Sequence, residues 1–97
     1  MRVIAKRVLR EFWERHPDSQ QQLKAWYAEA KSAAWHAPTD VKAKYGTASI
    51  LKDSRVVFNI CGNRYRLVVK INYPYQVMYI RFLGSHEQYD AIDAETI

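Results

Sequence analysis

The dipeptide Gly62-Asn63 constrains the fold of this chain more than any other feature. It lies between two apolar runs, 55–60 and 65–71. Glycine followed by asparagine at such a place is typical of a two-residue hairpin with a type II′ turn, and the turn fixes the register of the two strands. One face is then continuously apolar, with the predicted pairs Ile60 and Tyr65, Phe58 and Leu67, and Val56 and Val69. The other face pairs Asn59 with Arg66, Val57 with Val68, and Arg55 with Lys70.

A third strand is predicted after a turn at 73–76. It runs from Val77 to Leu83 and is ended by Gly84. By alternation, Met78, Ile80 and Phe82 join the apolar face, and Tyr79 and Arg81 point the other way. The predicted sheet therefore gathers five basic residues on one face, namely Arg55, Arg64, Arg66, Lys70 and Arg81.

The charge of the chain is concentrated in this segment. Residues 55–86 contain those five bases and no carboxylate, whereas the remainder carries ten bases and ten acids, so the net charge of +5 belongs to this one stretch. A localised positive field on a sheet indicates a polyanionic partner, with RNA as the first candidate.

The first half of the chain predicts helices. Apolar residues recur at helical spacing from Ala5 to His16, Pro17 ends that helix, and a second helix follows with a capping box from Asp18 to Gln21. The connection is so short that the two helices form an antiparallel hairpin. The predicted buried stripes are Val8, Leu9, Phe12 and Trp13 on the first helix, and Leu23, Trp26, Tyr27, Ala30 and Ala34 on the second.

The remaining segments are short. Arg2–Ile4 is a candidate strand, and Thr39 or Asp40 caps a short helix that Gly46 closes. Residues 47–54 form a loop pinned to the core by Ile50-Leu51. After the sheet, residues 86–92 form one or two helical turns with His86 and Tyr89 on the same side, and residues 93–97 fray.

Length and composition indicate one globular domain over residues 1–97, and the predicted helices followed by a predicted sheet place it in the α+β class. No apolar run approaches the roughly 20 residues that span a bilayer, and the N-terminus lacks the pattern of a signal peptide. We therefore expect a cytoplasmic protein without a membrane partner. Cys61 is the only cysteine, which excludes an internal disulfide. The three histidines have no ligand spacing, so neither a metal site nor a cofactor is predicted. Cys61 is interpreted as a small packing residue, although basic surroundings favour a lowered thiol pKa.

The sequence resembles the HigB-type toxins of bacterial type II toxin–antitoxin systems, within the RelE-like ribonucleases. The resemblance covers nearly the whole chain and rests on REFWERHPD (10–18), the helix at 23–27, VVFNICGNRYRLVVKINY (56–73) and YIRFLGSHEQYDAID (79–93). Cys61 stands where the family usually has Gly, and Ser85 where Thr is more usual.

The resemblance implies a RelE-like fold, with an N-terminal helical hairpin on a curved, mainly antiparallel sheet and a short C-terminal helical tail. It implies metal-independent cleavage of mRNA, often on the ribosome, which stops translation and growth. It also implies an antitoxin partner with a helix-turn-helix, so that DNA is contacted only through the antitoxin.

RNA cleavage without a metal needs a base for the 2′-OH, an acid for the 5′-oxygen and cations for the phosphorane. His86 is the first candidate for proton transfer because an unperturbed imidazole titrates near pH ~6.5, and Lys70 or Tyr89 is the candidate for the complementary role. Arg66 and Arg81 are candidates to stabilise the phosphorane. The predicted RNA-binding residues are Arg55, Arg64, Arg66, Lys70, Arg81 and Tyr79.

Structural roles compete with each of these assignments. His86 can simply cap the helix, and any single arginine can form a solvated salt bridge. Tyr79 and Tyr89 can pack, stack on bases or, for Tyr89, donate a proton. Two other functions use the same face: a non-catalytic RNA-binding module, and a protein-interaction domain for an acidic partner. The sparse exposed aromatics disfavour the first of these alternatives.

Overall fold

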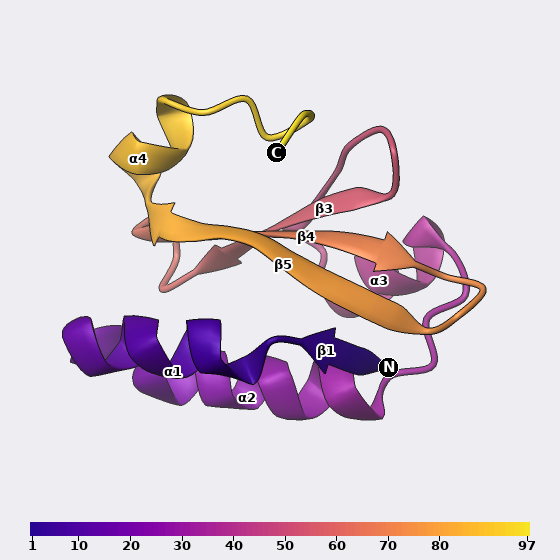
Figure 1. Ribbon diagram of the computed structural model, residues 1–97, viewed down its shortest axis with the longest axis horizontal. Helices are drawn as coiled ribbons and strands as arrows, with labels where there is room; N and C mark the ends of the chain where they lie inside the picture. The colour runs from indigo at the N-terminus through magenta and orange to yellow at the C-terminus, as the bar shows by residue number, and fades with distance from the viewer.

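The computed structural model describes all 97 residues and shows helices packed on a sheet, with a short helix near the C-terminus (Figure 1). In chain order, the elements are β1 (Arg2–Ile4), α1 (Lys6–Arg15), the 3-10 turn η1 (Pro17–Ser19), α2 (Gln20–Ser32), α3 (Pro38–Lys44), β2 (Ser49–Ile50), β3 (Arg55–Ile60), β4 (Tyr65–Asn72), β5 (Val77–Ser85) and α4 (His86–Asp90). Helices α1 and α2 lie on one side of the sheet, and α4 with the C-terminal segment lies on the other. The predicted α+β architecture is confirmed. No helix is long and apolar enough to cross a bilayer.

The sheet has five strands in the order β1-β5-β4-β3-β2. Only β1 is parallel to its neighbour, β5, so the sheet is mainly antiparallel. The register of β3 and β4 is the predicted one, with Ile60 opposite Tyr65 and Arg55 opposite Lys70. The connection is longer than the predicted two-residue turn, because residues 61–64 lie outside both strands and Cys61 (φ 54°) as well as Gly62 (φ 66°) has a positive φ. The Arg64 N–H still donates to the Cys61 carbonyl at 3.2 Å, and the positive φ at position 62 is one that glycine adopts without steric cost.

The third strand departs from simple alternation. A β-bulge at Val68/Val69 sets Val69 opposite Ile80 but Val68 opposite Phe82, which leaves Arg81 as the extra residue. The prediction that Phe82 joins the helix-facing apolar face is therefore wrong, because the extra residue reverses the phase of the strand. Phe82 packs instead against the cluster that contains Val68 on the opposite face. The strand also continues through Gly84 rather than ending there.

The main core lies between the sheet and helices α1 and α2. Its largest fully buried side chains include Trp26, Phe58, Leu9 and Leu23. Two predicted core positions are wrong. Val8 is 39% exposed, at the margin of the stripe, and Ala34 is exposed because α2 ends at Ser32.

The predicted capping signals for α2 and α3 are also wrong. Ser19 precedes α2 without a capping bond, and the Asp18 carboxylate binds residues of the sheet instead. Helix α3 begins at Pro38, and Asp40 in its first turn accepts a hydrogen bond from the His36 N–H at 2.9 Å.

The C-terminal segment docks on the sheet, contrary to the prediction that residues 93–97 fray. Ala94 is only 8% exposed and packs on Val57 and Val68, which makes a second, smaller core. Leu51 packs against this cluster, whereas Ile50 lies in the edge strand β2 and is 40% exposed, so only Leu51 pins its loop.

Candidate nucleic-acid interface

The docked C-terminal segment divides the face of the sheet that was predicted to be continuous and basic. Val57 and Val68 are 2% and 0% exposed on that face because Ala94 covers them. Two regions remain open on either side of this cover: the hairpin end, with α4, and a groove near the 73–76 turn. The five predicted cations do not share one open surface.

Arg55 lies beneath the C-terminal segment. Its guanidinium donates from Nε and Nη2 to the main-chain oxygen of Ile97 at 2.9 and 2.6 Å, and it lies 3.9 Å from Asp53. With its side chain only 8% exposed, Arg55 has neither the access nor the free donors of a phosphate contact. The structure thus places it as an anchor, contrary to the prediction that it lies on an open RNA face.

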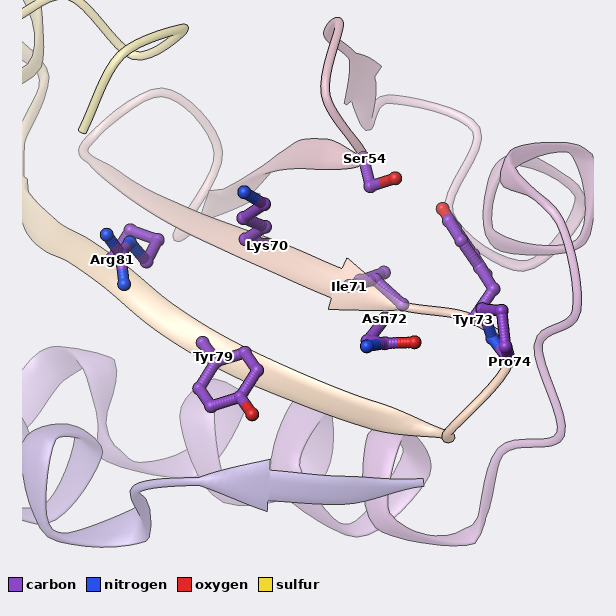
Figure 2. A pocket seen from close by; sticks show the side chains of 8 residues that line it. All are labelled: Ser54, Lys70, Ile71, Asn72, Tyr73, Pro74, Tyr79 and Arg81. Atoms are coloured by element: carbon purple, nitrogen blue, oxygen red, sulfur yellow. The ribbon is translucent and has the colours of Figure 1, made fainter.

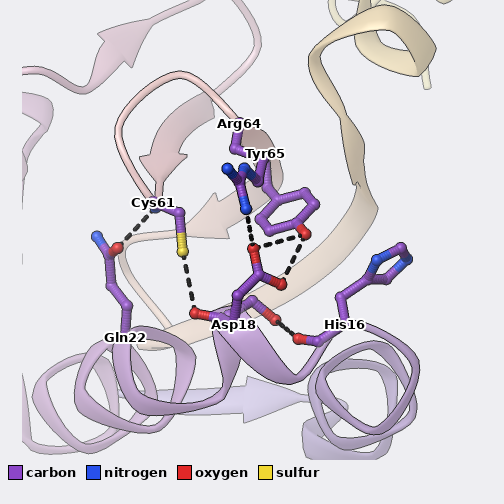
Figure 3. A network of polar contacts seen from close by, with 7 residues as sticks. His16, Asp18, Gln22, Cys61, Arg64 and Tyr65 are labelled. Atoms are coloured by element: carbon purple, nitrogen blue, oxygen red, sulfur yellow. Dashed lines mark hydrogen bonds and ion pairs between the residues drawn. The ribbon is translucent and has the colours of Figure 1, made fainter.

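Arg64 turns toward the helix layer, where Asp18 meets it (Figure 3). The Arg64 Nη1 lies 2.6 Å from Asp18 Oδ2, and the Tyr65 hydroxyl donates to both carboxylate oxygens at 2.8 and 3.0 Å. These hydrogen bonds from Arg64 and Tyr65 hold the pKa of Asp18 below its ordinary value, and the bond to Asp18 raises the pKa of Arg64. Arg64 is therefore salt-bridged to Asp18 rather than free, which contradicts its predicted place on the basic face.

Cys61 belongs to the same network. Its N–H donates to Gln22 Oε1 at 2.6 Å, and its thiol lies 3.4 Å from the main-chain oxygen of Asp18. Burial raises the pKa of the Cys61 thiol, and the charge of Asp18 adds to that effect. The lowered pKa considered from the sequence is wrong, and the interpretation of Cys61 as a packing residue agrees with these contacts.

The hairpin end carries Arg66 and the short helix α4. The Arg66 guanidinium lies 5.9 Å from the centre of the Tyr89 ring, within cation–π range. Tyr89 also contacts Phe82, with ring centroids 6.4 Å apart. Arg66 donates only to its own turn, at Asn63 and the Tyr65 carbonyl, and pairs with no acid. It remains available to an anion.

His86 opens helix α4 and is exposed. Its Nε2 lies 3.3 Å from Asp90 Oδ2, one helical turn on, which leaves Nδ1 without a partner. The helix is held by a capping box in which the Ser85 hydroxyl accepts from Gln88 N and the Gln88 side chain accepts from Ser85 N. Gly84 gives that box its space, because a Cβ there would lie 2.6 Å from Gln88 Oε1 and 2.7 Å from Phe82 Cζ.

The second open region is a groove of about 490 Å³, lined by Lys70, Tyr79, Arg81, Asn72 and Ser54 among others (Figure 2). Lys70 lies directly opposite Tyr79 in the β4–β5 ladder, and Arg81 is the residue extruded by the bulge. Bulges are common beside functional sites because they redirect a side chain.

The two open regions are separate. Lys70 pairs with Tyr79, whereas Arg66 pairs with Gly84, two residues before α4 begins. Lys70 is four positions beyond Arg66 along β4, a rise of roughly 13 Å. Lys70 and His86, both predicted to act in catalysis, therefore stand at different ends of the face.

Two carboxylates near the site were not predicted. Asp90 lies beside His86, and their i,i+4 spacing in a helical tail was a usable signal. Asp18 holds Arg64 across 46 residues of sequence, and no local pattern indicates that contact.

Comparisons with known proteins agree with this arrangement. A family profile described as HigB_toxin, RelE-like toxic component of a toxin-antitoxin system, matches residues 19–92. The chain is similar to the "mRNA interferase toxin HigB" of Escherichia coli (strain K12) and to the "mRNA interferase HigB" of Escherichia coli O157:H7 and of Shigella flexneri. Each is 28% identical over 96 residues, which cover 97% of this chain and 92% of the relative.

Proposed function

The chain belongs to the HigB family of RelE-like toxic components of toxin–antitoxin systems, and from this premise we propose that it is an endoribonuclease that cleaves mRNA in the cytoplasm during translation. Its relatives are named mRNA interferases. A cognate antitoxin, expected to carry a helix-turn-helix, would neutralise it and make any contact with DNA.

One observation supports this proposal most strongly. Three cations on one side of the sheet, Arg66, Lys70 and Arg81, form no ion pair with any carboxylate. What sets these three apart from other unpaired cations is their place in the segment 55–86, which contains no acid that could balance their charge. Arg66 lies at the end of the sheet that carries the exposed His86, and Lys70 and Arg81 lie farther along the same side. This arrangement suits the binding of an extended polyanion and its cleavage at one end.

The proposed reaction uses the RNA's own 2′-hydroxyl. A base on the protein removes its proton, the 2′-oxygen attacks the adjacent phosphorus, and the bond from phosphorus to the 5′-oxygen breaks. An acid on the protein protonates that leaving oxygen. The products are a 2′,3′-cyclic phosphate and a 5′-hydroxyl, and no metal takes part.

The hairpin end has the groups for these steps. His86 carries one proton transfer, and Asp90 at 3.3 Å orients its ring. Tyr89, three residues along the same helix, suits the complementary transfer better than Lys70, which lies in the distant groove. Arg66, over the Tyr89 ring, stabilises the charge of the phosphorane.

Expression with and without the antitoxin tests the proposal. The protein alone should arrest growth, co-expression of the neighbouring antitoxin gene should restore it, and mapped mRNA fragments should carry 5′-hydroxyl ends. Growth arrest without new mRNA ends would favour a non-catalytic RNA-binding or protein-interaction module, and normal growth at high expression would contradict the toxin assignment.

A further inference from the structure

The groove near the 73–76 turn is rich in hydrogen-bond donors and has no acid in its lining. Neither the Lys70 nor the Arg81 side chain donates a hydrogen bond or forms an ion pair within the protein. The Asn72 amide contributes further donors, because its oxygen already accepts from Tyr75 N at 3.2 Å. Such a lining suits an anion and the acceptor atoms of a base.

Tyr79 supplies an aromatic surface beside these donors. It is 41% exposed, and no hydrogen bond or aromatic contact holds its ring. Figure 2 shows Tyr79 on β5, two residues from Arg81 and paired with Lys70 of β4, with its ring directed toward β1 and the Lys70 side chain directed away from it. An exposed ring on the same groove as unpaired cations is a combination by which proteins bind single-stranded nucleic acid.

The groove is distinct from the end of the sheet that carries His86. The rise along β4 from Arg66 to Lys70 is roughly 13 Å, and Phe82 and Ala94 of the second core lie on the face between them. A nucleotide whose phosphate is cut beside His86 therefore does not reach Tyr79, but a neighbouring nucleotide of the same strand can.

We propose that this groove is a second ribonucleotide subsite, in which Lys70 and Arg81 hold a phosphate of single-stranded RNA and Tyr79 stacks on a base that flanks the cleaved bond. The inference rests on the proposed ribonuclease function. It adds the place on the protein at which the uncut part of the RNA strand is held. Tyr79 and Lys70 then govern affinity and sequence preference rather than the chemical step.

The test separates binding from cleavage. Affinity is measured by fluorescence anisotropy with a short, labelled, single-stranded RNA whose 2′-hydroxyls are methylated, so that it cannot be cut. Tyr79→Leu should weaken binding about tenfold, and Tyr79→Phe should bind as wild type because it keeps the stacking surface. Lys70→Met should also weaken binding and should lower the slope of log affinity against log salt by about 0.7.

Lys31→Met is the matched control for Lys70→Met. Lys31 is exposed on α2, on the opposite side of the sheet, and has no ion pair. Lys31→Met removes the same charge as Lys70→Met. If Lys31→Met binds RNA as wild type does and Lys70→Met binds more weakly, the loss of affinity comes from the groove and not from the lower net charge. Circular dichroism checks that each variant folds. If a Tyr79 variant does not fold, Lys70→Met still tests the proposal, because Lys70 is exposed and its replacement should not disturb the fold.

Cleavage of unmodified mRNA in a translating extract is measured in parallel. Weaker binding with a maximal cleavage rate within threefold of wild type supports the subsite. Unchanged affinity in both Tyr79→Leu and Lys70→Met, or no binding by the wild type, overturns it while leaving the ribonuclease assignment intact. A loss of maximal rate without a loss of affinity would also overturn it, because the groove would then be part of the catalytic centre. If wild type binds but never cleaves, only the proposed ribonuclease function fails.

Discussion

Arg55→Met distinguishes two roles for one residue, an RNA contact or the anchor of the C-terminal segment. The structure favours the anchor, because two hydrogen bonds of 2.9 and 2.6 Å join the buried guanidinium to the Ile97 oxygen. Hydrogen bonds to charged groups contribute about 1.5–3 kcal/mol to stability. The contact with Asp53, whose side chain is 67% exposed, adds little after solvent screening. We expect Arg55→Met to lower the free energy of unfolding by about 1.5–3 kcal/mol.

For a domain of this size each kcal/mol shifts the melting temperature by about 4–8 °C, so Arg55→Met should melt roughly 6–24 °C below wild type. Thermal and urea unfolding followed by circular dichroism measure the change. The control is Lys70→Met, which removes the same charge from the neighbouring strand at an exposed position and should change stability by less than about 0.5 kcal/mol.

RNA affinity, measured at a temperature where both variants are folded, completes the comparison. Arg55→Met should bind RNA nearly as wild type does, and Lys70→Met should bind it more weakly. The opposite result would be an Arg55→Met protein with the melting temperature of the wild type and an RNA affinity as low as that of Lys70→Met. That result would refute the role of Arg55 as an anchor and support the sequence-based prediction that Arg55 contacts RNA.

Three further predictions concern the chemistry and the Asp18 contact. His86→Ala should lower the cleavage rate about 10²-fold or more in a single-turnover assay, and a loss below about threefold would transfer the proton role to another group. Cleavage without a catalytic metal should leave 5′-hydroxyl and 2′,3′-cyclic phosphate ends on mRNA cut in a translating extract, whereas 5′-phosphate ends would contradict the proposed reaction. Asp18→Asn should be less stable than wild type at neutral pH. The folded protein holds the pKa of Asp18 below its ordinary value of 3.8. The stabilisation that the ionised carboxylate gives the fold is therefore fully present above pH 3.8, and it is lost as the pH falls through the lowered pKa of the folded state. The stability difference between Asp18→Asn and wild type, from urea unfolding at several pH values, should therefore shrink on acidification, and a constant difference would exclude the ionised carboxylate as its source.

The register of the sheet was predictable because it depends on local chemistry. Gly62-Asn63 fixes which residues of β3 and β4 are opposite, and a slip by one residue would bury Arg66 and Lys70 in the main core. The same local reasoning found β1 and the helix after Ser85. Elements that are specified within a few residues of sequence can be read without the structure.

Other features depend on competition between distant segments. Asp18 has the spacing of a capping box with Gln21, but Arg64 and Tyr65 offer it charge-assisted bonds that a helix end cannot match. The bulge opposite Val68 and Val69 leaves no mark in the alternation of β5, which reads as a regular strand. Ala94 docks on Val57 and Val68, which the predicted register already placed on that face, and the bulge adds Phe82 to the same cluster.

The docked C-terminal segment connects stability to the proposed chemistry. Helix α4 carries His86 and Tyr89, and it is held at its start by the capping box and at its end by the segment that Arg55 anchors. Tyr89 packs on the second core, and its ring in turn supports the Arg66 guanidinium. Loosening the segment therefore disturbs the positions of the groups proposed for proton transfer, while the groove around Lys70 and Tyr79 keeps its own strands. It follows that Arg55→Met, although it touches no substrate, should reduce the maximal cleavage rate of the folded protein more than its affinity for RNA.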